Sequence, residues 1–324
     1  MEVHRWAATW PPSGRWRCVR PVRRCEMATG LQVPSGAVVV GVDGSDRSVR
    51  AVDWAAEEAE RRGARLHLVY AYEWPALTEG YEPISAEEML RPGHRMVQGQ
   101  VDRVREAHPG LAVSGEAALG RPSVVLVEAS RRASVVVVGA RGRGRFTGPL
   151  LGSVSQKVAA HAHGPVIVVR QQVTDLPGPV VVGADPEDPP RETLTFAFEE
   201  ARRRGCGVTV VAVSRELPFR VEYGEAAMEA FTRHVEEAEK RLHEVVDGIA
   251  AEHDIPFELR ISSAHPVDAI VEAAGADSLV VVGSRGHGGL ASVLLGSVSR
   301  GVLHRAPVVA VVRVFHQPVV EGTG

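Results

Sequence analysis

One glycine-rich phrase occurs twice in this chain, at the same place in each half of the sequence. Residues 135–155 read VVVVGARGRGRFTGPLLGSVS, and residues 279–299 read LVVVGSRGHGGLASVLLGSVS. In each copy an apolar run ends in a glycine, a second glycine follows after two residues, and Gly-Ser-Val-Ser follows after nine more. A buried strand that opens into a glycine-rich loop and then a helix is typical of a phosphate-binding site. The sequence therefore predicts two anion-binding loops.

Each copy combines features that suit a phosphate group. Glycines let the backbone approach a ligand closely, so that N–H groups bind anionic oxygens without a charged side chain. The segment 152–155 begins a helix, whose unpaired N-terminal N–H groups attract an anion. Its serine hydroxyls either donate to phosphate or cap the helix, and both roles remain open. Three arginines between positions 141 and 145 add positive charge to the first loop, whereas the second loop carries Arg285 and His287.

A carboxylate follows the first apolar run, where Asp43 lies within GVDGSDRS. Such a carboxylate can accept hydrogen bonds from a ribose or from the amino group of adenine. Alternatively, it caps the following helix or binds local backbone N–H groups. The second half has GADPEDPPRE at this place, with three prolines that remove N–H donors and two additional acids. We expect weaker or altered binding there, unless the prolines only begin the helix.

The apolar runs predict the elements that position these residues. Runs such as VVVVG are apolar at consecutive positions, which indicates strands buried on both faces of a parallel sheet. Their alternation with helical periodicity predicts a doubly wound α/β fold in each half. Strands are expected at 37–42, 65–72, 111–117, 134–140 and 165–170, and near 179–184, 207–214, 257–262, 278–284 and 307–313. Helices are expected at about 47–62, 86–107, 122–132 and 152–162, with a long charged helix near 222–253. Ligands of this fold bind at the carboxyl ends of the strands, where Asp43 and the first loop should meet.

The two halves align at an offset of 142 to 144 residues, which indicates a duplicated domain. We expect a disordered leader at 1–35, domains at 36–170 and 179–313, a linker at 171–178 and a tail at 314–324. The start of the leader is either a gene-start error, with translation beginning at Met27, or a basic tail that touches a partner.

Composition excludes several classes of function. A formal charge of −3 gives no basic field, which argues against bulk nucleic-acid binding. No apolar run approaches the roughly 18 residues that cross a bilayer, and the first 26 residues lack the apolar core of a secretory signal. The cysteines, Cys18, Cys25 and Cys206, form no CxxC pair, which fits a reducing cytosol. We therefore expect a cytoplasmic protein with neither a nucleic-acid nor a membrane partner.

With its G-x-x-G loop, nine-residue spacing, G-S and first-strand Asp, the chain resembles the universal stress proteins, in particular their tandem-domain, ATP-binding type. The resemblance implies Rossmann-like domains with five parallel strands in the order 3-2-1-4-5, each binding one ATP. Carried over, the nucleotide-binding residues of the first half are Gly41, Asp43, Ala71, Gly139, Arg141, Gly142, Gly152, Ser153, Val154 and Ser155. Those of the second half are Gly183, Asp185, Val213, Gly283, Arg285, Gly286, Gly296, Ser297, Val298 and Ser299.

Other catalytic and nucleotide-binding signatures are absent from the sequence. It contains no G-x-x-x-x-G-K-[ST], no metal-ligating His or Cys cluster, and no evident general base or nucleophile for fast hydrolysis. We therefore expect a stress-response regulatory protein that binds ATP, with Mg²⁺ as the companion ion of ATP, and hydrolyses it slowly at most. Two alternatives stay open: an adenylating enzyme of the adenine-nucleotide alpha-hydrolase type, and an interaction scaffold that binds no nucleotide.

The expected partners are an adenine nucleotide and an unidentified protein. The last strand of each half, at 165–170 and 307–313, is apolar enough to pair across an interface. Such pairing would give either a homodimer or a pseudo-dimer of the two halves. Alternatively, these edge strands are covered by other parts of the protein.

Overall fold

A computed structural model describes residues 31–73, 85–142, 151–171, 176–213, 225–284 and 295–313. Most of the predicted leader, residues 172–175 of the predicted linker and the whole predicted tail lie outside these residues. Within these ranges, no helix is both long and apolar enough to cross a membrane.

Strands and helices alternate along each half, as the apolar periodicity predicted. The first half contains β1 (Val38–Val42), α1 (Asp46–Arg62), β2 (Leu66–Tyr72), α2 (Ala86–Ala107), β3 (Val113–Leu119), α3 (Pro122–Ala129), β4 (Val135–Gly139), α4 (Ser153–His161) and β5 (Val166–Val169). The second half contains β6 (Val180–Ala184), α5 (Arg191–Arg204), β7 (Val208–Val213), α6 (Glu225–His253), β8 (Phe257–Ser262), α7 (Pro266–Ala274), β9 (Val280–Gly283), α8 (Ser297–Arg305) and β10 (Val308–Val312).

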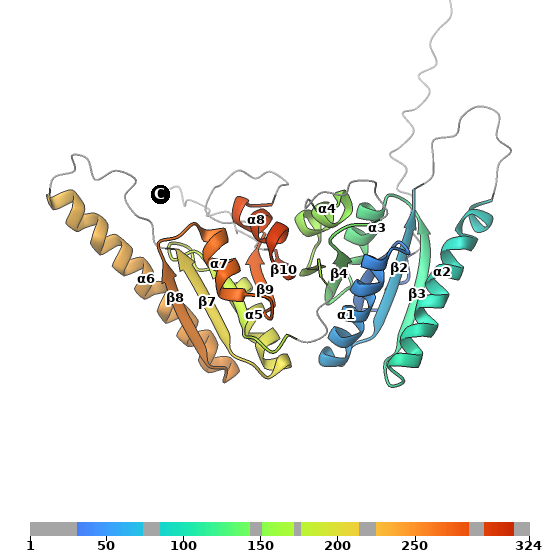
Figure 1. The fold of residues 1–324 in the computed structure, drawn as a ribbon, viewed down its shortest axis with the longest axis horizontal. Coiled ribbons are helices and arrows are strands. Elements are labelled where there is room, and N and C mark those ends of the chain that lie inside the picture. Colours follow the sequence, from blue (N-terminus) through green and yellow to red (C-terminus); the bar gives the residue numbers. More distant parts are fainter. Residues whose placement is uncertain are drawn as a thin grey trace, which may run out of the picture.

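The strands form one sheet with the order β3-β2-β1-β4-β5-β10-β9-β6-β7-β8. Within each half the neighbouring strands are parallel and follow the order 3-2-1-4-5, so the predicted fold class is confirmed. The halves meet where β5 pairs with β10 in antiparallel fashion, with Val168 opposite Val309. Figure 1 shows the halves side by side around this junction, with α2 and α6 at opposite outer ends. The last strand of each half therefore pairs within the chain.

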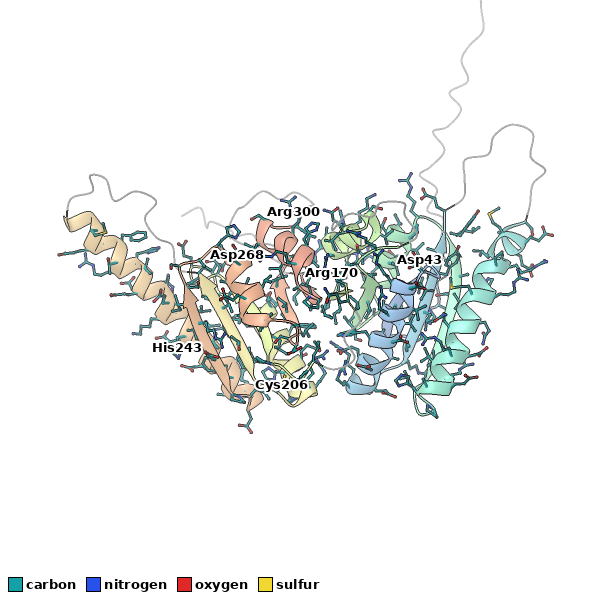
Figure 2. All side chains as sticks on the ribbon, in the orientation of Figure 1. Asp43, Arg170, Cys206, His243, Asp268 and Arg300 are labelled. Carbon is teal, nitrogen blue, oxygen red and sulfur yellow. The ribbon has the colours of Figure 1, made fainter. Side chains whose placement is uncertain are left out.

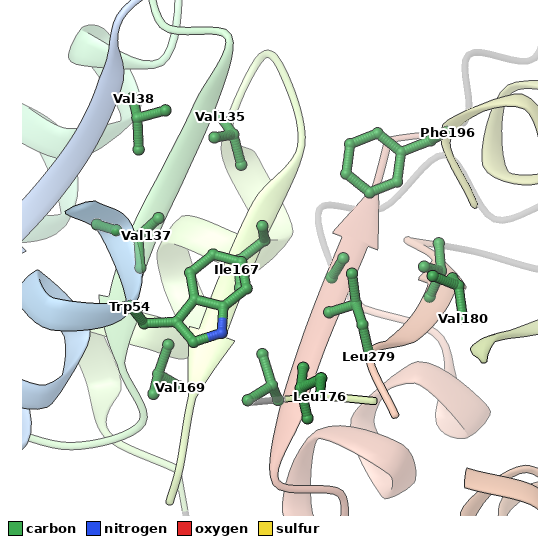
Figure 3. Close-up of a cluster of buried hydrophobic side chains, with 14 of the residues drawn as sticks. Val38, Trp54, Val135, Val137, Ile167, Val169, Leu176, Val180, Phe196 and Leu279 are labelled. Carbon is green, nitrogen blue, oxygen red and sulfur yellow. The ribbon is translucent and has the colours of Figure 1, made fainter. Parts of the chain in front are cut away.

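Valine-rich strands place a core on both faces of the sheet. Val38, Val39 and Val40 of β1 are fully buried, as expected for a strand covered by helices on both sides. One core lies between the sheet and helices α1, α2, α5 and α6, and the other lies between the sheet and α3, α4, α7 and α8. Near the junction, Trp54, Ile167 and Val169 of the first half lie close to Leu176, which precedes the second half, and to Leu279 within it (Figure 3). The apolar packing is therefore continuous across the two halves.

A buried charge cluster also joins the halves, where α1 meets α5. Arg62 of α1 forms an ion pair with Glu200 of α5, and Arg204 of α5 forms one with Glu58 of α1 at 2.8 Å. Both glutamate side chains are fully buried. Burial and the charge of Glu58 raise the pKa of Glu200 to about 7. Although burial opposes ionisation, Arg204 and Arg62 lower the pKa of Glu58.

Candidate functional site

The strand order brings the two predicted parts of the first site together. Strand β1 pairs with β4, so their carboxyl ends are neighbours at one edge of the sheet. Asp43 follows β1, and Gly142 lies in the loop after β4. The backbone of Gly142 packs so closely against Asp43 that a Cβ atom there would overlap the carboxylate oxygen Oδ2. Any larger residue at position 142 would therefore displace the carboxylate or the loop.

The two carboxylate oxygens of Asp43 have different surroundings. Oδ1 accepts hydrogen bonds from the backbone N–H of Ser45 at 3.0 Å and from its hydroxyl at 2.6 Å. The Ser45 oxygen in turn accepts from the N–H of Ser48 and caps α1. The local role that the sequence left open for Asp43 is thus observed at Oδ1. Oδ2 faces the glycine loop, and Asp43 as a whole is half-buried.

The first turn of α4 presents backbone N–H groups at the same edge. Gly152 is the N-cap, and no side chain caps the helix. The first helical hydrogen bond runs from the N–H of Gln156 to the carbonyl of Gly152 at 3.1 Å. The N–H groups of Ser153, Val154 and Ser155 therefore precede the region of intrahelical pairing. An anion placed there would meet three donors and the positive end of the helix dipole.

The hydroxyl of Ser155 faces the protein. It is buried and donates to the carbonyls of Ala140 and Gly152, each at 2.9 Å. The sequence left open whether this hydroxyl donates to phosphate or caps the helix. The observed contact is neither of these, and it fixes the start of α4 to the end of β4. Ser299 makes a comparable contact in the second half, where it donates to the carbonyl of Gly283, the last residue of β9, at 2.5 Å. Ser153 and Ser297, in contrast, are exposed.

The glycines within the first strands of the two halves have a packing role. A Cβ atom on Gly41 would lie 2.8 Å from Leu126 Cδ1, and one on Gly183 would lie 2.6 Å from Ile270 Cδ1. These positions thus let α3 and α7 pack closely on the sheet. The packing role of these two glycines depends on contacts between segments distant in the chain, which the sequence alone did not reveal.

The strand-two candidates lie at the same edge. Val42 of β1 is opposite Tyr70 of β2, so the register places Ala71 level with Asp43. Ala71 and Val213 are half-buried and pack on the core beneath α3, α4, α7 and α8. An alanine or valine here offers an apolar surface next to the carboxylate.

The second site repeats the backbone frame of the first. The N–H of Gly296 donates to the carbonyl of Ser284 at 3.0 Å, as the N–H of Gly152 does to Ala140 at 2.7 Å. Gly296 is the N-cap of α8, again without a side-chain cap. Val298 occupies the first turn of α8, like Val154 in α4. The remaining loop candidates, Arg285 and Gly286, lie outside the described residues.

The loop after β6 differs from its counterpart after β1. Asp185 Oδ1 accepts from the N–H of Glu187 at 3.0 Å, which matches the contact of Asp43 with Ser45. However, Pro190 is the N-cap of α5 and makes no capping hydrogen bond. Pro190 therefore does stand at the start of α5, one of the roles that the sequence left open for it. Glu187 and Asp188 also place negative charge beside this site.

Two arginines that the sequence analysis did not single out lie at the edge of the sheet that carries the first site. Arg47 lies in the first turn of α1, and Arg170 directly follows β5. Figure 2 shows Arg170 near the junction of the two halves and Asp43 in the first half. The signal that could have identified Arg170 is its repetition, since Arg313 ends the last strand of the second half in the same way.

Comparison with known proteins assigns the family. The model of the universal stress protein family matches residues 35–170 and 178–313. The chain belongs to the universal stress protein family. Universal stress protein Rv2005c of Mycobacterium tuberculosis is 34% identical over 288 residues, which cover 85% of this chain and 96% of the relative. The predicted family and its tandem arrangement are thus confirmed.

One solved structure shares the fold of the whole chain, and another resembles part of its sequence. A universal stress protein from Archaeoglobus fulgidus has a TM-score of 0.60 and 22% identity, and the match covers 87% of this chain and 97% of that protein. A universal stress protein in complex with cAMP is 31% identical and has a TM-score of 0.35, with 43% of this chain and 99% of that protein covered.

Proposed function

We propose that this universal stress protein is a cytoplasmic regulatory protein that binds ATP at the carboxyl edge of its first half. The observation that carries the proposal is the contact between Gly142 and Asp43, beside the uncapped first turn of α4. A carboxylate can accept hydrogen bonds from the nucleoside, and a set of backbone donors can bind the phosphates at the other end of a nucleotide. They come from adjacent strands, at the edge where ligands of this fold bind.

Each part of the site has a separate task in this proposal. Asp43 accepts hydrogen bonds from the nucleoside, and Ala71 supplies an apolar surface for the base. The N–H groups of 153–155 bind the phosphates, because they are unpaired donors at the positive end of a helix. Gly142 keeps the space between these groups open. Mg²⁺ would accompany ATP as its counterion.

The proposal describes binding with slow turnover at most. Backbone N–H groups and arginines stabilise phosphates in the ground state, whereas fast hydrolysis requires a base that activates water. Ser155, a buried hydroxyl in the first turn of α4, donates to the carbonyls of Ala140 and Gly152. We propose that nucleotide occupancy regulates a partner interaction, through loops that lie on one edge of the sheet.

Isothermal titration calorimetry of the full chain with ATP tests the proposal. We expect saturable binding that Gly142→Val abolishes, since a side chain at 142 collides with Asp43. Gly99→Val is the matched control, because Gly99 is exposed on α2 and no atom lies near its added Cβ. Absence of ATP binding to the parent protein, or equal binding by both variants, would contradict the proposed site.

A further inference from the structure

The strand at the outer end of the second half, β8, has neighbours on one side only. The sheet ends at β8, and among the described residues no strand pairs with its outer side (Figure 1). No residue of β8 is buried, whereas Val113 and Ala117 of β3, at the other end of the sheet, are buried and α2 packs closely on that strand. An edge strand of this kind offers a row of backbone groups to another strand.

Helix α6 covers β8 incompletely. Phe257 contacts the ring of His243 in α6, with 6.0 Å between the ring centroids. Farther along the strand, Leu259 and Ile261 line a groove between β8 and α6. Ile261 is 43% exposed, so it is one of three large apolar side chains exposed among the described residues. An apolar groove beside an open strand edge is suited to the addition of a further strand.

The direction of the β8 backbone decides which residues a further strand can bond. The carbonyl of Pro256, just before the strand, accepts a hydrogen bond from the N–H of Val208 in β7 at 3.0 Å. Backbone groups alternate in direction along a strand, so those of the even-numbered residues of β8 face β7 and those of the odd-numbered residues face outward. The outward-facing residues are Phe257, Leu259 and Ile261.

The charges of β8 select one register for pairing with a second copy of this strand. An antiparallel pair brings outward-facing residues opposite each other. If Leu259 lies opposite Leu259 of the second copy, each Glu258 lies opposite an Arg260. A shift of the sum of paired positions by two residues would instead place Glu258 opposite Glu258, or Arg260 opposite Arg260. Because like charges directly opposite are destabilising, the register centred on Leu259 is favoured.

Glu258 and Arg260 already lie on the same face of β8 in one chain. Nε and Nη2 of Arg260 each donate to the Glu258 carboxylate at 2.9 Å. The side chains of Glu258 and Arg260 are 58% and 49% exposed, so this ion pair adds little to the stability of one chain. A second copy would add a guanidinium to each Glu258 and produce a row of four alternating charges. Strand β3 carries Glu116 but no cation, so this pattern is specific to the second half.

We infer that two copies of the chain associate through β8, paired in antiparallel fashion around a two-fold axis at Leu259. Leu259 exchanges backbone hydrogen bonds with its own counterpart, and Phe257 exchanges them with Ile261 of the second copy. The apolar side chains of these residues then cover one another in the groove beside α6. Such a contact closes on itself, because both copies use the same surface. The inference does not depend on nucleotide binding.

Acids on the wall of the groove formed by α6 add repulsion between two copies. The charged residues of this wall are Glu236, Glu239, Lys240, His243, Glu244 and Asp247. Lys240 offsets part of the negative charge, with Nζ 3.9 Å from Glu244. At about 0.15 M salt, exposed charges more than about 8 Å apart are largely screened, whereas the Cα atoms of a Glu258–Arg260 pair across the two strands are about 4.5 Å apart. We therefore expect the charges of β8 to determine pairing at this ionic strength.

Sedimentation equilibrium of the full chain at about 0.15 M salt and about 1 to 100 µM protein tests the inference. We expect the average mass to rise with concentration toward twice the 34.7 kDa of one chain. Glu258→Arg and Arg260→Glu should each raise the dissociation constant of the dimer roughly tenfold or more, because each turns two attractive pairs into repulsive ones. Arg131→Glu is the matched control, since it breaks a similarly exposed ion pair, with Glu128, outside β8.

A mixture of the two variants separates pairing from a change in the folded chain. Equimolar Glu258→Arg and Arg260→Glu chains should form a heterodimer about as tight as the parent dimer, because two arginines then face two glutamates. The double variant E258R/R260E should also associate like the parent, since it remains complementary to itself. Both positions are exposed, so all of these variants should fold normally, which thermal melting checks.

Three outcomes would overturn the inference. The first is a parent chain that stays monomeric up to about 100 µM, which would leave the proposed nucleotide binding intact. The second is a dimer of unchanged strength in either single variant, which would place the contact elsewhere on the chain. The third is a mixture of the two variants that associates no better than each variant alone.

Discussion

At the residue scale, the first site depends as much on missing side chains as on those present. Gly142 leaves room for the Asp43 carboxylate, and Gly152 lets α4 begin close to Arg141. Ser153 and Ser155 lie two residues apart in the first turn of α4, yet the first is exposed and the second is buried and donates to two carbonyls. Comparing the two serines therefore measures how much the buried hydrogen bonds of Ser155 stabilise the fold.

We expect Ser155→Ala to lower the free energy of unfolding by about 1 kcal/mol, the usual contribution of a buried hydrogen bond. Ser153→Ala should change it by less than about 0.5 kcal/mol, because an exposed serine without a capping bond adds little. Urea denaturation of both variants measures the difference. Equal stability losses would mean that the Ser155 contacts are unimportant for the frame.

The sequence was sufficient to predict that Asp43 and the first glycine loop share one edge, because parallel strands with helical crossovers place their carboxyl ends together. It was not sufficient for Ser155 or Gly41. One of the two acceptors of Ser155, Ala140, lies 15 residues away along the chain, and Gly41 owes its role to Leu126. Both depend on how a loop or helix returns to the sheet, which local residue types do not specify.

At the scale of elements, the two halves repeat one frame but differ in the loop after their first strand. Ser45 caps α1 with its side chain, whereas Pro190 begins α5 without such a bond. The predicted elements match the observed ones to within a few residues, and the largest shifts are at helix ends such as that of α3, at Ala129. Helix ends are set by capping and packing, so periodicity alone locates them poorly.

Matched alanine substitutions compare the two loops. Asp43→Ala should weaken ATP binding roughly tenfold or more, since a hydrogen bond to a charged group is lost. Asp185→Ala should leave the ATP affinity of the tighter site, which lies in the first half, nearly unchanged. Each aspartate accepts one backbone N–H at 3.0 Å, and Asp43 also accepts the Ser45 hydroxyl at 2.6 Å, so the unfolding free energy of both variants is measured alongside their affinities. Calorimetry that shows equal effects would contradict the assignment of the main site to the first half.

At the scale of the whole molecule, reciprocal contacts hold the halves together. Glu58 and Arg62 of α1 face Arg204 and Glu200 of α5, and the strands β5 and β10 pair beneath them. The sequence left the partner of these strands open, because an apolar edge strand can pair within its own chain or with a second copy. Only the assembled sheet shows that the two strands pair with each other.

The buried carboxyls predict a pH dependence of stability. Folded Glu200 has a pKa of about 7, raised from 4.5, so between these values the folded protein retains a proton that the unfolded chain releases. The stabilisation linked to Glu200 is therefore fully present below pH 4.5 and declines as pH rises to 7. The lowered pKa of Glu58 acts in the opposite sense, and its contribution is lost only at more acidic pH.

We expect Glu200→Gln to flatten the decline in unfolding free energy between about pH 5 and pH 7, because the titrating carboxyl is removed. Glu199→Gln, which alters a partly exposed ion pair with Arg203 on the same helix, should retain the decline. Urea denaturation of both variants across this pH range tests the prediction. Parallel pH profiles for parent and Glu200→Gln would show that Glu200 does not titrate in this window.

The central claim is that the first half holds a nucleotide between Asp43 and α4, and native mass spectrometry of the full chain with ATP tests it most directly. We predict a discrete adduct of one ATP per chain at low ligand excess, absent from Gly142→Val and retained by Gly99→Val. No ATP adduct on the parent, or the same fraction of adduct on the parent and on Gly142→Val, would contradict the account.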